Sequence, residues 1–402
     1  MENKRFHIGL LPRILIAIVL GIGAGYIFPE WLARIFETFN SIFSEFLGFC
    51  IPLIILGFVA PAIADIGTRA GKMLVVTALI AYFASVCAGW ISFITGSVCF
   101  PKMIEPNAYL AEIAASGAGL QPYFTVKMPP LMTVMTALVL AFVLGLGTSY
   151  LTSDNMRGFL RDLRDVIAMV IRGAIIPLLP VYIFGIFLNM TITGQVGSIL
   201  STFIKIIAVI FVLHVFILVL QYTIAAFFQR GTHNPLKLLR NMLPAYFTAL
   251  GTQSSAATIP VTLRQTIRMG VSEDVAGFVV PLCATIHMSG SILKIVACAL
   301  ALMITRGIPY DVSMFAGFIC MLGITIIAAP GVPGGAIMAS LGLLTSILGF
   351  SEADNALMIA LYIAMDSFGT ACNVTGDGAI AIIINRFFGS KALDAEHGQE
   401  EL

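Results

Sequence analysis

Charged side chains are scarce in this sequence of 402 residues. Asp, Glu, Lys and Arg make up 11% of it, whereas hydrophobic residues make up 59%. A soluble domain carries about a quarter charged residues, so this composition excludes an ordinary water-soluble protein and indicates an integral membrane protein. A helix needs about 20 apolar residues to cross a bilayer. Most of the charge-free stretches are that long: 46–64, 73–101, 128–153, 173–204, 206–229 and 312–351.

Signals of several other protein classes are also missing. The seven cysteines are scattered, mostly in apolar runs, and form no CxxC pair, so they predict packing residues rather than a disulfide framework. A net charge of +1 gives no reason to propose nucleic acid as a partner. The first apolar run, ILIAIVLGIGAGYIF, lacks a recognisable cleavage site and is expected to remain as a membrane span.

The remaining charges are distributed unevenly between alternate loops. Lys4, Arg5 and Arg13 precede the first span, and further basic residues recur in every second connection. The intervening connections are poorer in Lys and Arg, and segment 102–124 is expected to be an external loop. This bias predicts a multi-pass protein of the cell membrane with both termini in the cytoplasm.

Two apolar segments are unsuited to a simple membrane crossing. The charge-free stretch 312–351 contains APGVPGG near its middle, where two prolines and three glycines should break a helix. Segment 241–263 contains GTQSSAATIP, whose small hydroxyl residues favour a local hydrogen-bonded loop. Each precedes one long span, which predicts a repeat of a hairpin and a helix over 236–305 and 310–386. The orientation rule places the two hairpins on opposite sides, so the repeat is inverted, as at the binding sites of secondary transporters.

The stretch DSFGTACNVTGD places two carboxylates, eleven residues apart, inside an apolar region. On a helix, Asp366, Thr370, Asn373 and Asp377 fall on one stripe. Intramembrane carboxylates mark ion or substrate pathways, so Asp366 is expected to hold an ammonium group or a cation. The sequence NVTG, with a β-branched pair and a glycine, is expected to interrupt this helix and free backbone carbonyls for a hard cation such as sodium.

Four motifs together resemble the dicarboxylate/amino acid:cation symporters, the glutamate-transporter family. They are SSAATIPVTLR (254–264), CATIHMSGS (283–291), GVPGGAIM (331–338) and DSFGTACNVTGD (366–377). The resemblance covers nearly the whole chain and is strongest from about residue 240 to residue 388. It implies an all-α polytopic membrane protein with eight transmembrane helices and two re-entrant helical hairpins in inverted repeats.

The resemblance also implies a division of labour and a set of site residues. Segments 10–70 and 125–195 would form the scaffold of a homotrimer, and segments 72–100 and 201–388 would form an elevator-like carrier, all within one transporter domain (1–400) in contact with membrane lipid. The implied substrate contacts are Ser254, Ser255, Ser291, Val332, Gly335, Asp366, Gly369, Thr370 and Asn373. The implied sodium ligands are Cys283, Thr285, His287, Met288, Ile326, Ile327, Ala329, Asn373 and Asp377.

The chain departs from the family pattern where acidic substrates are recognised. Two positions at which family members carry an arginine for the substrate's second carboxylate are Gly369 and Gln253. Burying that carboxylate unpaired would cost several kcal/mol. We therefore expect a sodium-driven symporter of a small neutral amino acid such as serine or threonine. The second hairpin tip is also one residue short and the eighth-helix motif opens with DS, as in the bacterial serine/threonine branch.

A second departure concerns the coupling ion. The family's asparagine–methionine–aspartate is here His287–Met288–Ser289, and Lys294 lies on nearly the same helical face. Three interpretations stay open: His287 is a neutral stand-in for asparagine, His287 and Lys294 titrate and make the transport proton-coupled, or Lys294 is the structural partner of a carboxylate.

Other functions are less well supported by the sequence. A dicarboxylate or acidic amino acid transporter is an alternative within the same class. An intramembrane hydrolase built on Ser254 or Ser255 lacks a GxSxG or HExxH motif. A channel would use Asp377 in a filter, but filters need a ring of residues from several subunits. No cofactor other than the coupling cation is expected.

Overall fold

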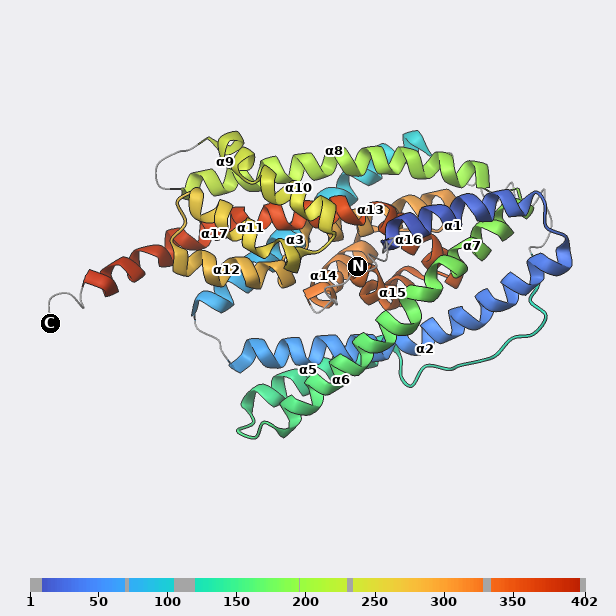
Figure 1. Ribbon diagram of the computed structural model, residues 1–402, viewed down its shortest axis with the longest axis horizontal. Helices are drawn as coiled ribbons and strands as arrows, with labels where there is room; N and C mark the ends of the chain where they lie inside the picture. Colours follow the sequence, from blue (N-terminus) through green and yellow to red (C-terminus); the bar gives the residue numbers. More distant parts are fainter. Residues whose placement is uncertain are drawn as a thin grey trace, which may run out of the picture.

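The described part of the chain is helical throughout. A computed structural model describes residues 9–68, 72–104, 120–194, 196–229, 234–327 and 334–397, and within these ranges there is no β-strand. The helices are α1 (Leu10–Gly25), α2 (Glu30–Thr68), α3 (Lys72–Met103), α5 (Val134–Tyr150), α6 (Asn155–Val170), the π-helical turn η1 (Ile171–Ile175), α7 (Ile176–Ile192), α8 (Val196–Phe228), α9 (Pro235–Asn241), α10 (Leu243–Thr252), α11 (Ser255–Arg268), α12 (Glu273–Ile286), α13 (Ser289–Arg306), α14 (Val312–Ile327), α15 (Gly335–Leu348), α16 (Glu352–Ala364) and α17 (Asp366–His397) (Figure 1).

Six helical stretches of the described chain are long and apolar enough to cross a membrane. They include α2, α3 and α8, the continuous α6–η1–α7 rod, the α12–α13 pair and most of α17. This confirms the prediction of an all-helical, multi-pass membrane protein. The number of eight spans stays a prediction, and most of the expected external loop at 102–124 lies outside the described residues.

The helices pack in two groups. In one group, α1, α2, α5, α6 and α7 pack against one another, and α2 pairs with α5 along much of its length. In the other group, α13 and α17 are the most deeply buried helices. They are surrounded by α3, α8, α10–α12 and α14–α16. Figure 1 shows α2, α5 and α6 along one edge of the molecule and α8 along the opposite edge, with α10 and α17 between them. The functional division into scaffold and carrier stays a prediction.

Two helix pairs stand where the sequence predicts hairpins. The first is α10 and α11, joined only by Gln253, in the left-handed region at φ 54°, and Ser254, whose Oγ accepts the Ala257 N–H. The second is α14 and α15, which lie on either side of the proline- and glycine-rich segment. Arms of 10 to 16 residues reach about 15 to 24 Å, less than the roughly 30 Å hydrocarbon core. Their lengths favour re-entrant hairpins over full crossings.

Each hairpin is followed by a helix that is broken once. The first break lies at His287 and Met288, between α12 and α13, and the Met288 N–H donates to Ser85 Oγ at 3.1 Å. The second lies at Met365, between α16 and α17. The hairpin-plus-helix repeat is therefore present in the fold, whereas its inverted orientation in the membrane stays a prediction.

The prediction that NVTG interrupts the last helix is wrong. Helix α17 continues through these residues, and the break lies earlier, directly before Asp366. The glycine of this motif serves packing instead: a Cβ at Gly376 would lie 2.5 Å from Gln221 Oε1 and 2.6 Å from His287 Cε1. Gly376 thus allows side chains of α8 and of the α12–α13 break to approach α17 closely.

Candidate functional site

The two hairpins and the two helix breaks meet at one small cavity of about 90 Å³. That volume corresponds to about three water molecules of the liquid, so the cavity suits a small guest. Its lining combines hydroxyl and amide side chains with apolar ones and contains a single charged side chain, Asp366. The lining residues are Gln253, Ser254, Ser255, Ala256, Ala284, Thr285, Met288, Ser291, Gly335, Ala336, Tyr362, Asp366, Thr370 and Asn373.

Asp366 is the first residue of α17 and links three elements. Its Oδ1 lies 3.0 Å from Lys294 Nζ of α13, and its Oδ2 accepts the Gly334 N–H at 2.8 Å. Gly334 directly precedes α15, so the carboxylate joins the second hairpin to the core of the bundle. A carboxylate accepts about four hydrogen bonds, so Asp366 keeps acceptor capacity for a guest in the cavity.

Lys294 is completely buried behind Asp366 and does not line the cavity. Its Nζ also lies 3.4 Å from the carbonyl oxygens of Tyr362 and Met365 and 3.4 Å from the centroid of the Tyr362 ring. The interpretation of Lys294 as the partner of a carboxylate is the one that this geometry supports. Gly369, which the family resemblance implies as a substrate contact, instead faces Lys294: a Cβ at this position would lie 2.7 Å from Lys294 Nζ.

Asn373 is held by the beginning of α13. Its Oδ1 accepts the Gly290 N–H at 2.8 Å and the Ser291 N–H at 3.3 Å, and its Nδ2 donates to Ser291 Oγ at 3.0 Å. The side-chain oxygen therefore caps the broken helix. One of the two hydrogens on Nδ2 is left for a guest in the cavity.

Asp377 lies three turns further along α17 and outside the cavity. Its Oδ1 lies 2.9 Å from His287 Nδ1, and both side chains are buried. The other ring nitrogen, Nε2, is 3.3 Å from Gln221 Nε2, which also donates to Ser289 Oγ at 3.2 Å. The tautomer with its proton on Nδ1 satisfies both contacts, since the ring then donates to Asp377 and accepts from Gln221.

The residues predicted from the sequence fall into three sets. The cavity brings together Ser254, Ser255, Ser291, Gly335, Asp366, Thr370 and Asn373, with Thr285 and Met288 from the predicted sodium ligands. Gly369, Cys283, His287, Asp377, Ile326 and Ile327 are not in its lining. Val332 and Ala329 lie outside the described residues. Within the described chain, no cluster of three or more His, Cys, Asp and Glu side chains is arranged as a metal site.

Three residues of this region were not predicted. Tyr362 lines the cavity and donates from its hydroxyl to Ser291 Oγ at 3.2 Å, whereas Gln221 and Tyr222 approach α17 from α8. The Tyr222 hydroxyl donates to the Thr375 carbonyl at 2.7 Å. The polar pair Gln221–Tyr222 inside a largely apolar span was a signal that could have identified α8 as a partner of this site.

Comparison with known sequences agrees with this architecture. Residues 10–387 match the Sodium:dicarboxylate symporter family, and the chain belongs to this family. It is therefore a membrane transporter of the symporter class and not an enzyme. A relative named "Serine/threonine transporter SstT" from Acinetobacter baumannii is 26% identical over 387 residues, which cover 92% of this chain and 95% of the relative. A relative of the same name from Acinetobacter baylyi is 24% identical over 401 residues, which cover 96% and 99%.

Proposed function

We propose that this protein couples inward cation movement to the uptake of a small neutral amino acid such as serine or threonine. The observation that carries the proposal is the cavity lining, in which one carboxylate, Asp366, is the single charged side chain among hydroxyl and amide groups. A zwitterion presents one ammonium and one carboxylate to such a site. The names of the two relatives, both serine/threonine transporters, point the same way.

Each end of the zwitterion has suitable partners in the cavity. Asp366 holds the α-ammonium group with the acceptor capacity left by Lys294 and Gly334. The α-carboxylate is held by the free hydrogen of Asn373 Nδ2 and by the beginning of α11, where Ser254 and Ser255 lie. The N-terminal end of a helix offers unpaired N–H groups and partial positive charge to an anion.

A substrate with a second carboxylate is poorly matched to this lining. The described lining contains no arginine, and the side chain at position 253 is a neutral glutamine. An unpaired carboxylate buried there would cost several kcal/mol. We therefore propose a neutral amino acid ahead of an acidic amino acid or a dicarboxylate.

Sodium is the coupling ion that we propose first. The α12–α13 break and the Asp377 carboxylate offer oxygen atoms close to the cavity, and oxygen ligands suit hard cations. Thr285 and Met288 lie beside Asn373 in the lining, so a cation there would adjoin the substrate.

A proton is the second candidate, favoured by the contact of His287 with Asp377. In a protonated His287 both ring nitrogens donate, so Nε2 would need an acceptor in place of Gln221 Nε2. Gln221 Oε1 is buried without a hydrogen-bond partner among the described residues. Rotation of the Gln221 amide would bring this oxygen to His287 Nε2 as the acceptor.

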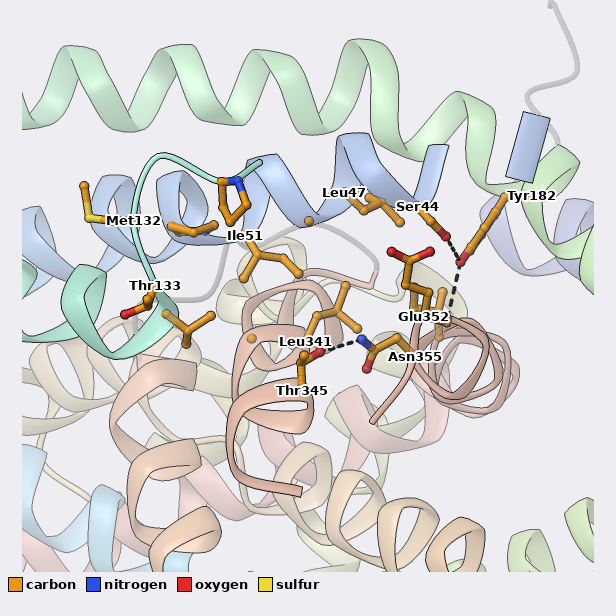
Figure 2. A pocket seen from close by; sticks show the side chains of 16 residues that line it. Ser44, Leu47, Ile51, Met132, Thr133, Tyr182, Leu341, Thr345, Glu352 and Asn355 are labelled. Atoms are coloured by element: carbon orange, nitrogen blue, oxygen red, sulfur yellow. Dashed lines mark hydrogen bonds between the residues drawn. The ribbon is translucent and has the colours of Figure 1, made fainter. Parts of the chain in front are cut away.

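The two helix groups support an elevator-like movement in which the second group carries the substrate past the first. Between them lies a cavity of about 270 Å³, lined mostly by apolar residues of α2, of segment 130–134, and of α15 and α16 (Figure 2). At its polar end, Ser44 Oγ lies 2.9 Å from the Tyr182 hydroxyl, which reaches the Glu352 carbonyl at 3.4 Å. This boundary is largely apolar, and its hydrogen bonds at the cavity join uncharged groups, so it suits sliding of one helix group past the other. We extend the proposal to a homotrimer, by family resemblance.

The test is uptake of labelled L-serine into proteoliposomes with an inward sodium gradient and no pH gradient. We expect saturable, sodium-stimulated uptake that unlabelled threonine inhibits and aspartate and succinate do not. If an inward proton gradient alone stimulates serine uptake, the coupling ion is the proton and not sodium. Absence of serine and threonine uptake under both gradients would overturn the proposal.

A further inference from the structure

The most unusual group in the core is the ammonium of Lys294. It lies in the second turn of α13, a helix whose described surface is almost entirely covered by protein. A charged side chain at such a place in a membrane protein is costly unless it has partners and a function. The proposed binding of substrate uses Asp366 but leaves the lysine behind it without a role.

The surroundings of Lys294 are arranged for a positive charge. The Nζ atom has three potential acceptors: Asp366 Oδ1 at 3.0 Å and the carbonyls of Tyr362 and Met365 at 3.4 Å. The Tyr362 carbonyl lies in the last turn of α16, and Met365 is the residue between α16 and α17. These two carbonyls also accept the Met365 and Gly369 N–H groups, and a carbonyl oxygen has a second lone pair for the ammonium. An ammonium group has three donors, so the acceptors match it in number.

The neighbouring backbone also makes room for the lysine. A Cβ at position 369 would lie 2.7 Å from Lys294 Nζ and 2.9 Å from its Cε, closer than packed atoms allow. Any side chain at Gly369 would therefore push the ammonium away from Asp366. The absence of a side chain at Gly369 of the DSFGT motif therefore leaves the space that the Lys294 side chain occupies.

Both members of the pair are side chains of this protein, and this has a consequence for the transport cycle. An empty carrier without Lys294 would take an uncompensated Asp366 carboxylate through the apolar boundary between the helix groups. With Lys294 in contact, the carboxylate is neutralised by a cation that never leaves the protein. Asp366 can still accept a substrate ammonium on its cavity side, so substrate and lysine do not exclude each other.

We propose that Lys294 is a permanently attached counter-ion that allows the empty carrier to return across the membrane. The inference rests on the proposed function, in which Asp366 binds the substrate ammonium. This role of Lys294 predicts different effects on two transport activities, net uptake and exchange. Net uptake needs the return of the empty carrier, whereas exchange of internal for external serine needs only the loaded carrier, in which the substrate ammonium also neutralises Asp366.

The experiment compares these two activities in Lys294→Met. Proteoliposomes are prepared either without internal serine, for net uptake, or with unlabelled internal serine, for exchange. We expect net uptake to fall by about ten-fold or more and exchange to stay within about two-fold of wild type, because only the empty state carries the unpaired carboxylate. Retained exchange also demonstrates that the variant is folded.

Two further variants test whether the effect depends on the contact between Lys294 and Asp366. Gly369→Ala keeps the lysine but displaces its ammonium, and the same selective loss of net uptake is expected. Lys205→Met makes the same substitution at a lysine of α8 that donates to the Met103 carbonyl, away from Asp366, and both activities are expected to stay at wild-type level.

A proportional loss of net uptake and exchange in Lys294→Met and in Gly369→Ala would overturn the inference, as would unchanged net uptake in both. These results leave the proposed function standing as long as the wild-type protein transports serine. If the wild type transports neither serine nor threonine in either assay, the proposed function itself fails.

Discussion

Asp366 and Asp377 are two buried carboxylates of the same helix, α17, but they differ in their position relative to the cavity and in their partner. Asp366 lines the cavity and is paired with a lysine, whereas Asp377 lies outside the cavity and is paired with a histidine. The ordinary pKa of lysine lies far above neutral pH, whereas that of histidine lies close to it, so the two partners differ in how readily they give up a proton.

From this difference we propose different tasks for the two carboxylates. A carboxylate with a permanent counter-ion can meet and release a substrate ammonium without becoming an isolated charge. A carboxylate with a conditional partner retains its negative charge for a coupling cation. The comparison therefore predicts that changes at Asp366 act on the substrate and changes at Asp377 act on the cation.

The largest effect is expected for Asp366→Ala, which should abolish serine uptake. It removes the partner of the substrate ammonium and leaves Lys294 buried without its carboxylate, a change that destabilises proteins by about 3–5 kcal/mol. Uptake and thermal unfolding of the purified variant measure both effects. Asp154→Ala, at an exposed ion pair with Arg157, is the matched control and should behave as wild type. Wild-type-like uptake in Asp366→Ala would refute the substrate assignment.

Asp377→Asn should raise the half-saturating sodium concentration by about ten-fold, the loss of one charged contact to the cation. Serine uptake at saturating sodium should change much less, because Asp377 does not line the cavity. The measurement is initial uptake over a sodium series at fixed serine. An unchanged sodium requirement would show that the cation binds elsewhere.

Gly376→Ala should disturb the Asp377 region without touching the cavity. The added methyl group would meet Gln221 and His287, and overpacking of this kind costs about 1–3 kcal/mol. We expect a lower unfolding temperature and a weaker cation dependence, with the inhibition pattern of amino acids unchanged. Gly317→Ala on α14 has open space at its Cβ and serves as the control. Equal behaviour of the two variants would contradict the close packing described at Gly376.

The smallest change is expected for Gln253→Arg, which brings a cation into the cavity lining. Aspartate should become a measurable inhibitor of serine uptake, because arginine pairs with a second carboxylate. This position is a cleaner test than Gly369, where an arginine would also displace Lys294. If aspartate still fails to compete, the tip of the first hairpin does not face the substrate as proposed.

Much of this fold could be predicted from the sequence because its signals are local. Proline and glycine clusters marked the hairpin between α14 and α15, and hydroxyl residues marked the tip at Ser254. The spacing of Asp366, Thr370 and Asn373 placed them on one helical face, and all three line the same cavity.

The remainder depends on which distant segments meet. The pairing of Lys294 with Asp366, and of His287 with Asp377, joins α13 or the break before it to α17. Gln221 reaches the site from a third element, α8. The local weakness of NVTG as a helix was outweighed by packing around α17, since Tyr222, Gln221 and His287 enclose this segment. Contacts of this kind between distant segments produce no periodic pattern in a single sequence.

The central claim, that Asp366 recognises the ammonium group of a zwitterion, is tested most directly by two fragments of serine. The measurement is inhibition of labelled L-serine uptake by 3-hydroxypropanoate, which lacks the ammonium group, and by ethanolamine, which lacks the carboxylate. We predict strong inhibition by unlabelled serine and threonine and little inhibition by either fragment. Inhibition by 3-hydroxypropanoate equal to that by serine would contradict the claim, because the site would then bind its substrate without using Asp366.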